Sequence, residues 1–295
     1  MVVMKLKLKL LALILAAALL LPGCAPQEQA EIAATTLPVY QFTSRLCQGT
    51  DISVIRLVNE SISCLHDYSL NVSQVKALEA AKVTVISGAG LEESMDELIA
   101  QSDQIIDCSV GTSLIHCHDH DAEQDHGHHH EADAHIWLSP EVARSMVEQI
   151  YQGLCQYYPE QQSIFQENRT ALLQELILLE EYGEQQLSDL SSRKLLTFHD
   201  GFAYFAQAFD LEIVHAIEEE SGSEASAQEL KDMIGIVREH QLPGIFTEKS
   251  GSVSAAGIIA RETGAQVYTL DMAMAGADYF QAMYHNIDTI KEALG

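Results

Sequence analysis

The residues best suited to chemistry lie in the stretch 116–139, which carries eight histidines: His116, His118, His120, His126, His128, His129, His130 and His135. Neutral imidazole is the commonest protein ligand for zinc and similar divalent ions, so the stretch predicts metal binding. Cys117 lies inside it and is a further candidate, because thiolates also bind zinc. A solvated low-complexity loop is the alternative, since composition alone says little about a site.

Four side chains elsewhere follow predicted strands and form a second candidate site: His66, His135, His199 and Asp271. Their strands are predicted, in the same order, at 52–58, 104–108, 194–198 and 266–270. Ligands of open parallel sheets bind beyond the carboxyl ends of the strands, so all four side chains can face one cleft. Three imidazoles and one carboxylate suit a tetrahedral divalent ion, above all zinc. Taken singly, such a histidine is more often a surface residue and such an aspartate more often a turn residue.

Strands and helices that could position these side chains alternate along the chain. Further strands are predicted at 31–36, 83–87, 211–217 and 244–247, and helices at 38–48, 74–81, 92–100, 140–158, 161–190, 201–209, 227–240, 252–263 and 278–294. Alternation of this kind predicts parallel sheets with helices on both faces. The helix over 161–190 would extend roughly 45 Å, more than one small lobe needs. The predicted fold is therefore α/β, with two Rossmann-like parallel-sheet lobes joined by a single long rigid α-helix and a metal cleft between them.

Local signals place several helix ends. Ser139-Pro140-Glu141 combines a cap, a proline at the first helical position and an acid near the positive end of the helix dipole. Ser73 and Ser226 are predicted to cap the helices that follow them, and Gly264 to end another. The predicted division of the chain is a signal peptide (1–23), a tether (24–30), an N-terminal lobe (31–158) with its His-rich loop (111–134), a linker helix (159–192) and a C-terminal lobe (193–295).

The first residues resemble an export signal. Lys5, Lys7 and Lys9 precede the apolar segment 10–21, which is too short to span a bilayer and ends at Pro22-Gly23-Cys24. A small residue before cysteine is typical of a lipoprotein signal, so we expect Cys24 to carry the lipid and to hold the protein on the outer face of the bacterial cell membrane.

Charge and cysteine content narrow the possible functions. The chain has a formal net charge of −27, which argues against nucleic acid, whose binding depends on neutralised phosphates. Besides Cys24 there are Cys47, Cys64, Cys108, Cys117 and Cys155, an odd number that excludes a complete disulfide framework.

Several segments together resemble a known family, the substrate-binding lipoproteins of zinc and manganese ABC importers. They are the signal peptide, 66–68 (His-Asp-Tyr), 88–92 (Gly-Ala-Gly-Leu-Glu), 133–140 (Asp-Ala-His-Ile-Trp-Leu-Ser-Pro), 198–205 (Phe-His-Asp-Gly-Phe-Ala-Tyr-Phe), 262–265 (Glu-Thr-Gly-Ala) and 270–271 (Leu-Asp). The resemblance implies a metal held between two lobes by His66, His135, His199 and Asp271, a permease as partner, and a monomer outside the cytoplasm.

The resemblance also bears on the metal. Manganese members tend to have glutamate at the position of His199, whereas zinc members tend to have histidine there and a His-rich loop, so zinc is expected ahead of manganese. Two motifs depart from the family pattern. Cys64-Leu65-His66 stands where Asp-Pro-His is usual, which makes Cys64 a candidate neighbour of the metal, and Met272-Ala273-Met274 stands where Pro-Leu-Gly is usual.

Two functions from other classes compete with transport. A metal buffer or adhesin would use the His-rich loop alone. A zinc hydrolase would need a motif such as His-Glu-x-x-His, and the nearest run, 130–135, is one residue too long. A closed site of four ligands also leaves no open position for water, so we do not expect an enzyme.

Overall fold

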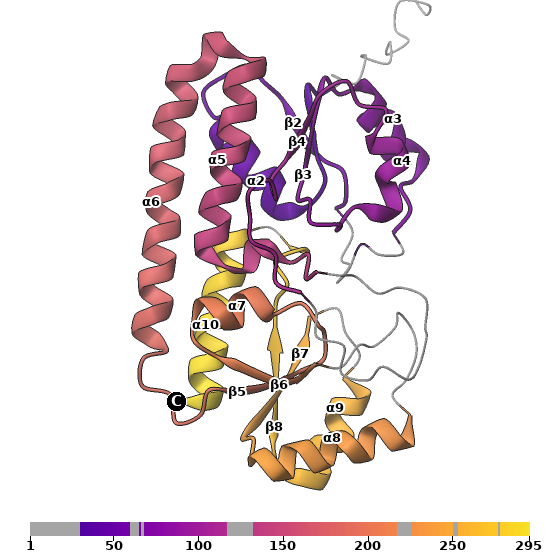
Figure 1. The fold of residues 1–295 in the computed structure, drawn as a ribbon, viewed down its shortest axis with the longest axis vertical. Helices are drawn as coiled ribbons and strands as arrows, with labels where there is room; N and C mark the ends of the chain where they lie inside the picture. Colours follow the sequence, from indigo (N-terminus) through magenta and orange to yellow (C-terminus); the bar gives the residue numbers. More distant parts are fainter. Residues whose placement is uncertain are drawn as a thin grey trace, which may run out of the picture.

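The computed structural model of the chain describes residues 30–59, 65, 68–116, 132–216, 226–249, 253–276 and 278–295. Over these ranges the strands form two four-stranded parallel sheets, ordered β2-β1-β3-β4 and β6-β5-β7-β8. Both lobes therefore share one topology, and Figure 1 shows them stacked with a helical pair along one side. The predicted fold of two parallel-sheet lobes joined by a long helix is confirmed.

The N-terminal lobe contains β1 (Ile32–Ala34), β2 (Val54–Arg56), β3 (Val83–Ile86) and β4 (Ile105–Asp107). Helix α2 (Leu37–Leu46) packs against β1, β2 and β3, while α3 (Val72–Ala80) and α4 (Asp96–Ile99) lie on the other side of the sheet (Figure 1). The single helix expected over 92–100 is instead a 3₁₀ turn, η1 (Glu93–Met95), followed by α4.

The predicted cap of α3 is wrong by two residues. The Asn71 side chain, not Ser73, accepts hydrogen bonds from the backbone N–H groups of Ser73 and Gln74, at 2.9 and 3.1 Å. In turn, the side-chain oxygen of Gln74 accepts a hydrogen bond from the backbone N–H of Asn71 at 2.8 Å. This capping box needs an extended residue before the first turn, and Ser73 already lies inside that turn.

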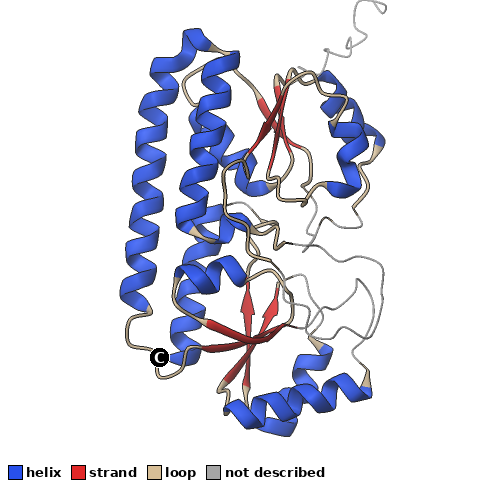
Figure 2. Ribbon diagram, viewed as in Figure 1, coloured by secondary structure: helices blue, strands red, loops and turns tan. Residues whose placement is uncertain are grey.

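Helices α5 (Pro140–Tyr157) and α6 (Gln162–Gln186) form an antiparallel pair, with the short turn η3 (Pro159–Gln161) between them. Helix α5 lies along the N-terminal lobe, and α6 continues beside the C-terminal lobe (Figure 2). Ser139 caps α5 as predicted, accepting from the backbone N–H of Val142 at 3.4 Å. Helix α6 has 25 residues and ends earlier than expected. The Arg193 guanidinium donates hydrogen bonds to the carbonyls of Leu187 and Ser188 just beyond the helix. A side chain from the following loop therefore supplies donors that the end of the helix lacks.

The C-terminal lobe repeats the alternation with β5 (Lys194–Thr197), β6 (Glu212–Ala216), β7 (Gly244–Glu248) and β8 (Gln266–Leu270). Its helices are α7 (Ala203–Ala208), α8 (Ala227–His240), α9 (Ser254–Thr263) and α10 (Tyr279–Leu294). Ser226 caps α8 as predicted, and Gly264, with φ of 83°, ends α9 in the left-handed conformation that glycine adopts at little cost.

One hydrophobic core extends through both lobes, from β1 to α10, and a second, smaller core lies within the C-terminal lobe beneath α8 and α9. Trp137, in the 3₁₀ turn η2 (Ile136–Leu138), is fully buried in the first of these cores. Its indole Nε1 donates to the carbonyl of Met272 at 2.8 Å, and its own carbonyl accepts from the Tyr279 hydroxyl at 2.8 Å. Arg56, at the end of β2, donates to the carbonyl of Met274 at 2.7 Å. The loop after β8 is therefore attached to the N-terminal lobe.

The helices in the described ranges are those of a protein built from two sheets and their covering helices. None of them is both long and apolar enough to cross a bilayer.

Glu92 is a buried carboxylic acid at the strand ends of the N-terminal lobe. It accepts hydrogen bonds from the Thr35 hydroxyl at 2.6 Å and from the backbone N–H groups of Ser87 and Gly88 at 2.8 and 3.0 Å. These bonds favour the ionised form, but burial outweighs them and raises the pKa of Glu92 to about 7.

We predict that Glu92 makes the protein less stable as the pH rises from about 4.5 to about 7. The unfolded chain loses this proton first, so the native state gives up about 3 kcal/mol across that window. Glu92→Gln cannot titrate and should show a smaller fall in the free energy of urea unfolding between pH 5 and pH 8. Glu97→Gln, on the exposed side of α4, serves as the control. Equal pH slopes for the wild type and Glu92→Gln would contradict this role.

Candidate metal site between the lobes

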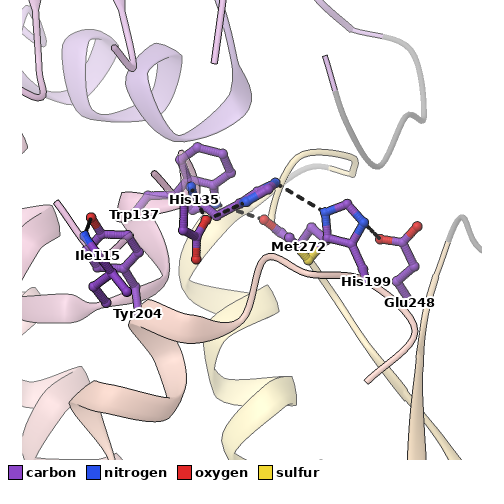
Figure 3. A network of polar contacts seen from close by, with 8 residues as sticks. Ile115, His135, Trp137, His199, Tyr204, Glu248 and Met272 are labelled. Atoms are coloured by element: carbon purple, nitrogen blue, oxygen red, sulfur yellow. Dashed lines mark hydrogen bonds and ion pairs between the residues drawn. The ribbon is translucent and has the colours of Figure 1, made fainter. Parts of the chain in front are cut away.

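His135 and His199 face one another where the two lobes meet (Figure 3). His135 directly precedes η2 on the side of the N-terminal lobe, and His199 follows β5 of the C-terminal lobe. Their Nε2 atoms lie 3.3 Å apart, and their ring planes are inclined by 86°. The structure thus brings together two residues that are 64 positions apart in the chain.

The His135 ring is held in place by Asp133. One carboxylate oxygen of Asp133, Oδ1, lies 2.8 Å from the backbone N–H and 2.8 Å from the ring Nδ1 of His135. An acceptor at Nδ1 assigns the proton to that nitrogen and leaves the lone pair on Nε2, toward His199. Asp133 and His135 are both buried, and the Trp137 ring packs edge-on against the imidazole at a centroid distance of 5.3 Å.

His199 also has a carboxylate behind it, but at a longer distance. Its Nδ1 lies 3.9 Å from Oε2 of Glu248, the last residue of β7, and Figure 3 shows Glu248 on the side of the ring that faces away from His135. Glu248 is buried. Neither Asp133 nor Glu248 was singled out from the sequence, although Glu248 also lies at the end of a predicted strand, and the strand-end argument could have found it.

Asp271 directly follows β8, as predicted, and its carboxylate is buried. Its Oδ1 accepts from the backbone N–H of Ala273 at 2.9 Å, and its Oδ2 lies 2.7 Å from the Lys249 ammonium. Asn286 on α10 bonds both the backbone N–H and the carbonyl of Asp271, each at 2.7 Å. The backbone at this position is therefore fixed, and the carboxylate has a cation beside it.

The remaining candidates fall into two groups. His66, Cys24, Cys64, Cys117 and six loop histidines (His118, His120, His126, His128, His129 and His130) lie outside the described residues. His116 is described and lies next to Ile115, whose backbone N–H bonds the Tyr204 hydroxyl at 3.0 Å. Within the described ranges, no three His, Cys, Asp or Glu side chains form a group that could hold a metal ion. His135 and His199 are thus a pair, and a complete site would need further ligands.

The spacing of this pair suits zinc. Two nitrogens bound tetrahedrally at about 2.0–2.1 Å from one ion would lie about 3.3–3.4 Å apart. The two Nε2 atoms are 3.3 Å apart. The carboxylate of Asp133, hydrogen-bonded to His135, is also an arrangement usual at zinc sites, because such a bond orients the ring and makes it a better metal ligand.

One protein-family model matches most of the chain. The family described as "Zinc-uptake complex component A periplasmic" (ZnuA) matches residues 32–293. The chain belongs to the ZnuA family. The resemblance inferred from the sequence is thereby confirmed.

Relatives of this ZnuA-family chain have been named for different metals. A crystal structure of ZnuA is 30% identical, with a TM-score of 0.77, and the match covers 91% of this chain and 100% of that one. The zinc-binding lipoprotein AdcA of Streptococcus pneumoniae serotype 4 (strain ATCC BAA-334 / TIGR4) is 27% identical over 97% of this chain, but the match spans only 61% of AdcA. The manganese-binding lipoprotein MntA of Halalkalibacterium halodurans is 27% identical over 78% of this chain and 77% of MntA.

In this ZnuA-family chain, Gly201 lets the imidazoles of His135 and His199 approach the loop after β5. A Cβ atom at this position would lie 2.7 Å from His135 Nδ1, from His199 Cδ2 and from Met272 Cε. All three contacts are far closer than van der Waals distance, and the His135 ring is already held by Asp133. The glycine is therefore required by close packing around the pair.

We predict that Gly201→Ala costs about 1–3 kcal/mol of unfolding free energy, because it overpacks a buried site. Gly235→Ala is the matched control, since a Cβ there, in the middle of α8, meets nothing within 4 Å. That control should instead gain roughly 0.5–1 kcal/mol from helix propensity. Urea unfolding measures both variants. Equal changes in the two would show that Gly201 is not packed against the histidines.

Proposed function

We propose that this protein captures Zn(II) between its lobes, outside the cytoplasm, and delivers it to the permease of an ABC importer. The observation that carries the proposal is the facing pair of Nε2 atoms at 3.3 Å, one from each lobe. Each imidazole has a carboxylate at its Nδ1 side, from Asp133 and Glu248. Family membership supports the same conclusion and supports a binding protein over an enzyme.

We propose His66, His135, His199 and Asp271 as the ligands. His135 and His199 supply the pair. Asp271 directly follows β8, and the next residue, Met272, brings its side chain to Gly201 beside both imidazoles. His66 is proposed as the fourth ligand because it follows the strand β2 in the chain, and ligands of parallel sheets bind beyond the carboxyl ends of strands. With four ligands the site would be closed, as suits a carrier that performs no chemistry on its cargo.

Zinc is favoured over manganese because the proposed set is rich in imidazole. Manganese prefers oxygen ligands, whereas zinc binds neutral imidazole well. Manganese remains the second candidate, since MntA shows that a relative of similar identity is named for that metal. The His-rich loop, His116 to His130, is proposed as an accessory that collects zinc weakly near the cleft.

The proposed location follows from the sequence and from the relatives. AdcA and MntA are named lipoproteins, and the family is described as periplasmic. We propose that cleavage before Cys24 leaves a monomeric protein attached to the outer face of the cell membrane by lipid. The domain boundaries expected from the sequence, with a linker at 159–192, are part of the same proposal.

Single alanine substitutions at the four ligands test the site. We predict that His135→Ala and His199→Ala each weaken zinc binding at least about 100-fold, because each removes a ligand and leaves a buried polar environment behind. Titration against a competing chelator measures the change. His215 lies on β6 and is not among the proposed ligands, so His215→Ala is the control and should bind zinc as the wild type does. Unchanged affinity in both cleft variants would place the metal elsewhere.

Deletion of residues 116–130 separates the cleft from the loop. If the cleft is the main site, one tightly bound zinc ion should survive the deletion, as counted by native mass spectrometry. A metal buffer or adhesin that uses the loop alone would lose all zinc binding. The result therefore decides between the transport receptor and its main competitor.

His199→Glu tests the choice of metal. We predict that this change lowers the ratio of zinc to manganese affinity at least about tenfold, because it replaces a nitrogen donor with an oxygen donor. His199→Gln is the control, since it removes the imidazole without adding a charge. An unchanged ratio in His199→Glu would contradict the assignment of His199 as a ligand.

A further inference from the structure

The end of β7 places charged side chains beside two of the proposed ligands. In the C-terminal sheet, β7 lies between β5, which leads to His199, and β8, which leads to Asp271. Glu248 ends β7 and approaches His199, and the next residue, Lys249, contacts Asp271. The strand between the two ligand strands thus supplies a neighbour of opposite charge type to each proposed ligand: an acid to the imidazole and a base to the carboxylate.

Lys249 is held where its ammonium can reach Asp271. Its backbone N–H continues the β7–β8 ladder by bonding the carbonyl of Leu270 at 3.0 Å. Its Nζ lies 2.7 Å from Asp271 Oδ2, and the side chain of Asp271 is 7% exposed whereas that of Lys249 is 60% exposed. A buried carboxylate is therefore neutralised by a lysine whose stem reaches in from solvent.

This arrangement sets up a competition for one oxygen atom. Both carboxylate oxygens of Asp271 have a hydrogen-bond donor, the backbone N–H of Ala273 at Oδ1 and the Lys249 ammonium at Oδ2. The backbone donor is fixed whereas the lysine side chain is flexible and 60% exposed, so Oδ2 is the oxygen that a metal ion could gain. A divalent ion at Oδ2 would be repelled by an ammonium 2.7 Å from the same atom. The lysine can yield at modest cost, because its flexible stem is largely in water and its charge can be hydrated elsewhere.

Taking Asp271 as a ligand of the proposed zinc site, we propose that Lys249 is a specificity-determining residue that weakens the carboxylate ligand and thereby favours zinc over manganese. Any metal must displace or tolerate the ammonium before it can use Asp271. Zinc loses less, because its imidazole ligands are unaffected, whereas manganese depends more on carboxylate oxygen. Lys249 acts through Asp271 and does not itself touch the metal.

Lys249→Gln removes the charge while keeping a side chain of similar length. We expect zinc affinity to rise by up to about tenfold and manganese affinity to rise more, so that the zinc-to-manganese ratio falls at least about threefold. Both affinities are measured by chelator competition on the purified protein. Lys249→Arg keeps the charge beside Asp271 and should keep the wild-type ratio. A ratio that is unchanged in Lys249→Gln, or zinc affinity that falls, overturns the proposal.

The reactivity of the lysine amine gives a second readout that a purely structural role would not change. Zinc should release Lys249 from Asp271 and speed its labelling by an amine-reactive reagent several-fold, as quantified by peptide mass spectrometry. Lys82 is the matched control, because it also pairs with an acid, Glu31. It lies at the amino end of β3, whereas the proposed site lies beyond the carboxyl ends of the strands. Its labelling should not depend on zinc. Labelling of Lys249 that zinc leaves unchanged contradicts displacement.

Asp271→Ala distinguishes failure of this proposal from failure of the proposed function. If Asp271→Ala weakens zinc binding and Lys249→Gln changes neither metal, Asp271 remains a ligand and the role of Lys249 is refuted. If Asp271→Ala leaves zinc affinity unchanged, Asp271 is not a ligand and both assignments fall. If the proposal holds, Lys249→Gln changes the metal ratio in the wild type and loses most of that effect in the Asp271→Ala background. Circular dichroism and thermal unfolding confirm that each variant is folded.

Discussion

One hydrophobic core shared by the two lobes is the constraint on which the proposed site depends. The buried Trp137 belongs to that core, and its indole is hydrogen-bonded to the loop that follows β8. Tyr279 at the start of α10 bonds back to the carbonyl of Trp137. Because close-packed interiors deform little, these contacts fix how far apart the strand ends of the two lobes can lie. A pair of nitrogens from opposite lobes can then keep the 3.3 Å spacing that a tetrahedral ion requires.

Electrostatics around the pair follow from which charges are buried. Asp133 and Glu248 are buried acids next to His135 and His199, and they would offset part of the positive charge of a bound ion. At Asp271 the opposite holds, because Lys249 already supplies a positive charge. The net charge of −27 would attract cations only weakly at a distance, since salt screens exposed charges. Selectivity must therefore come from the few buried groups.

Most elements of the fold could be predicted from the sequence because their signals are local. Ser139-Pro140 and Ser226 start helices where expected, and Gly264 ends one. The predictions went wrong where two neighbouring polar residues compete for one cap, as with Asn71 and Ser73, and where a helix end is bonded by the loop that follows it. Arg193 bonds the carbonyls of Leu187 and Ser188 just beyond α6, and the spacing of apolar residues, from which the helix was predicted, carries no signal of such a side-chain bond.

By itself the sequence determined the alternation of strands and helices, the family, and the candidate ligands at strand ends, since each of these rests on residue type and short spacing. Only the tertiary structure decided which candidates meet. It placed His135 and His199 face to face. It also revealed Asp133 beside His135, Glu248 beside His199 and Lys249 beside Asp271. The physical reason is that hydrogen bonds and ion pairs act over a few ångströms. The order of strands in the sheets and the packing of the two lobes on one core, not distance along the chain, decide which side chains come that close.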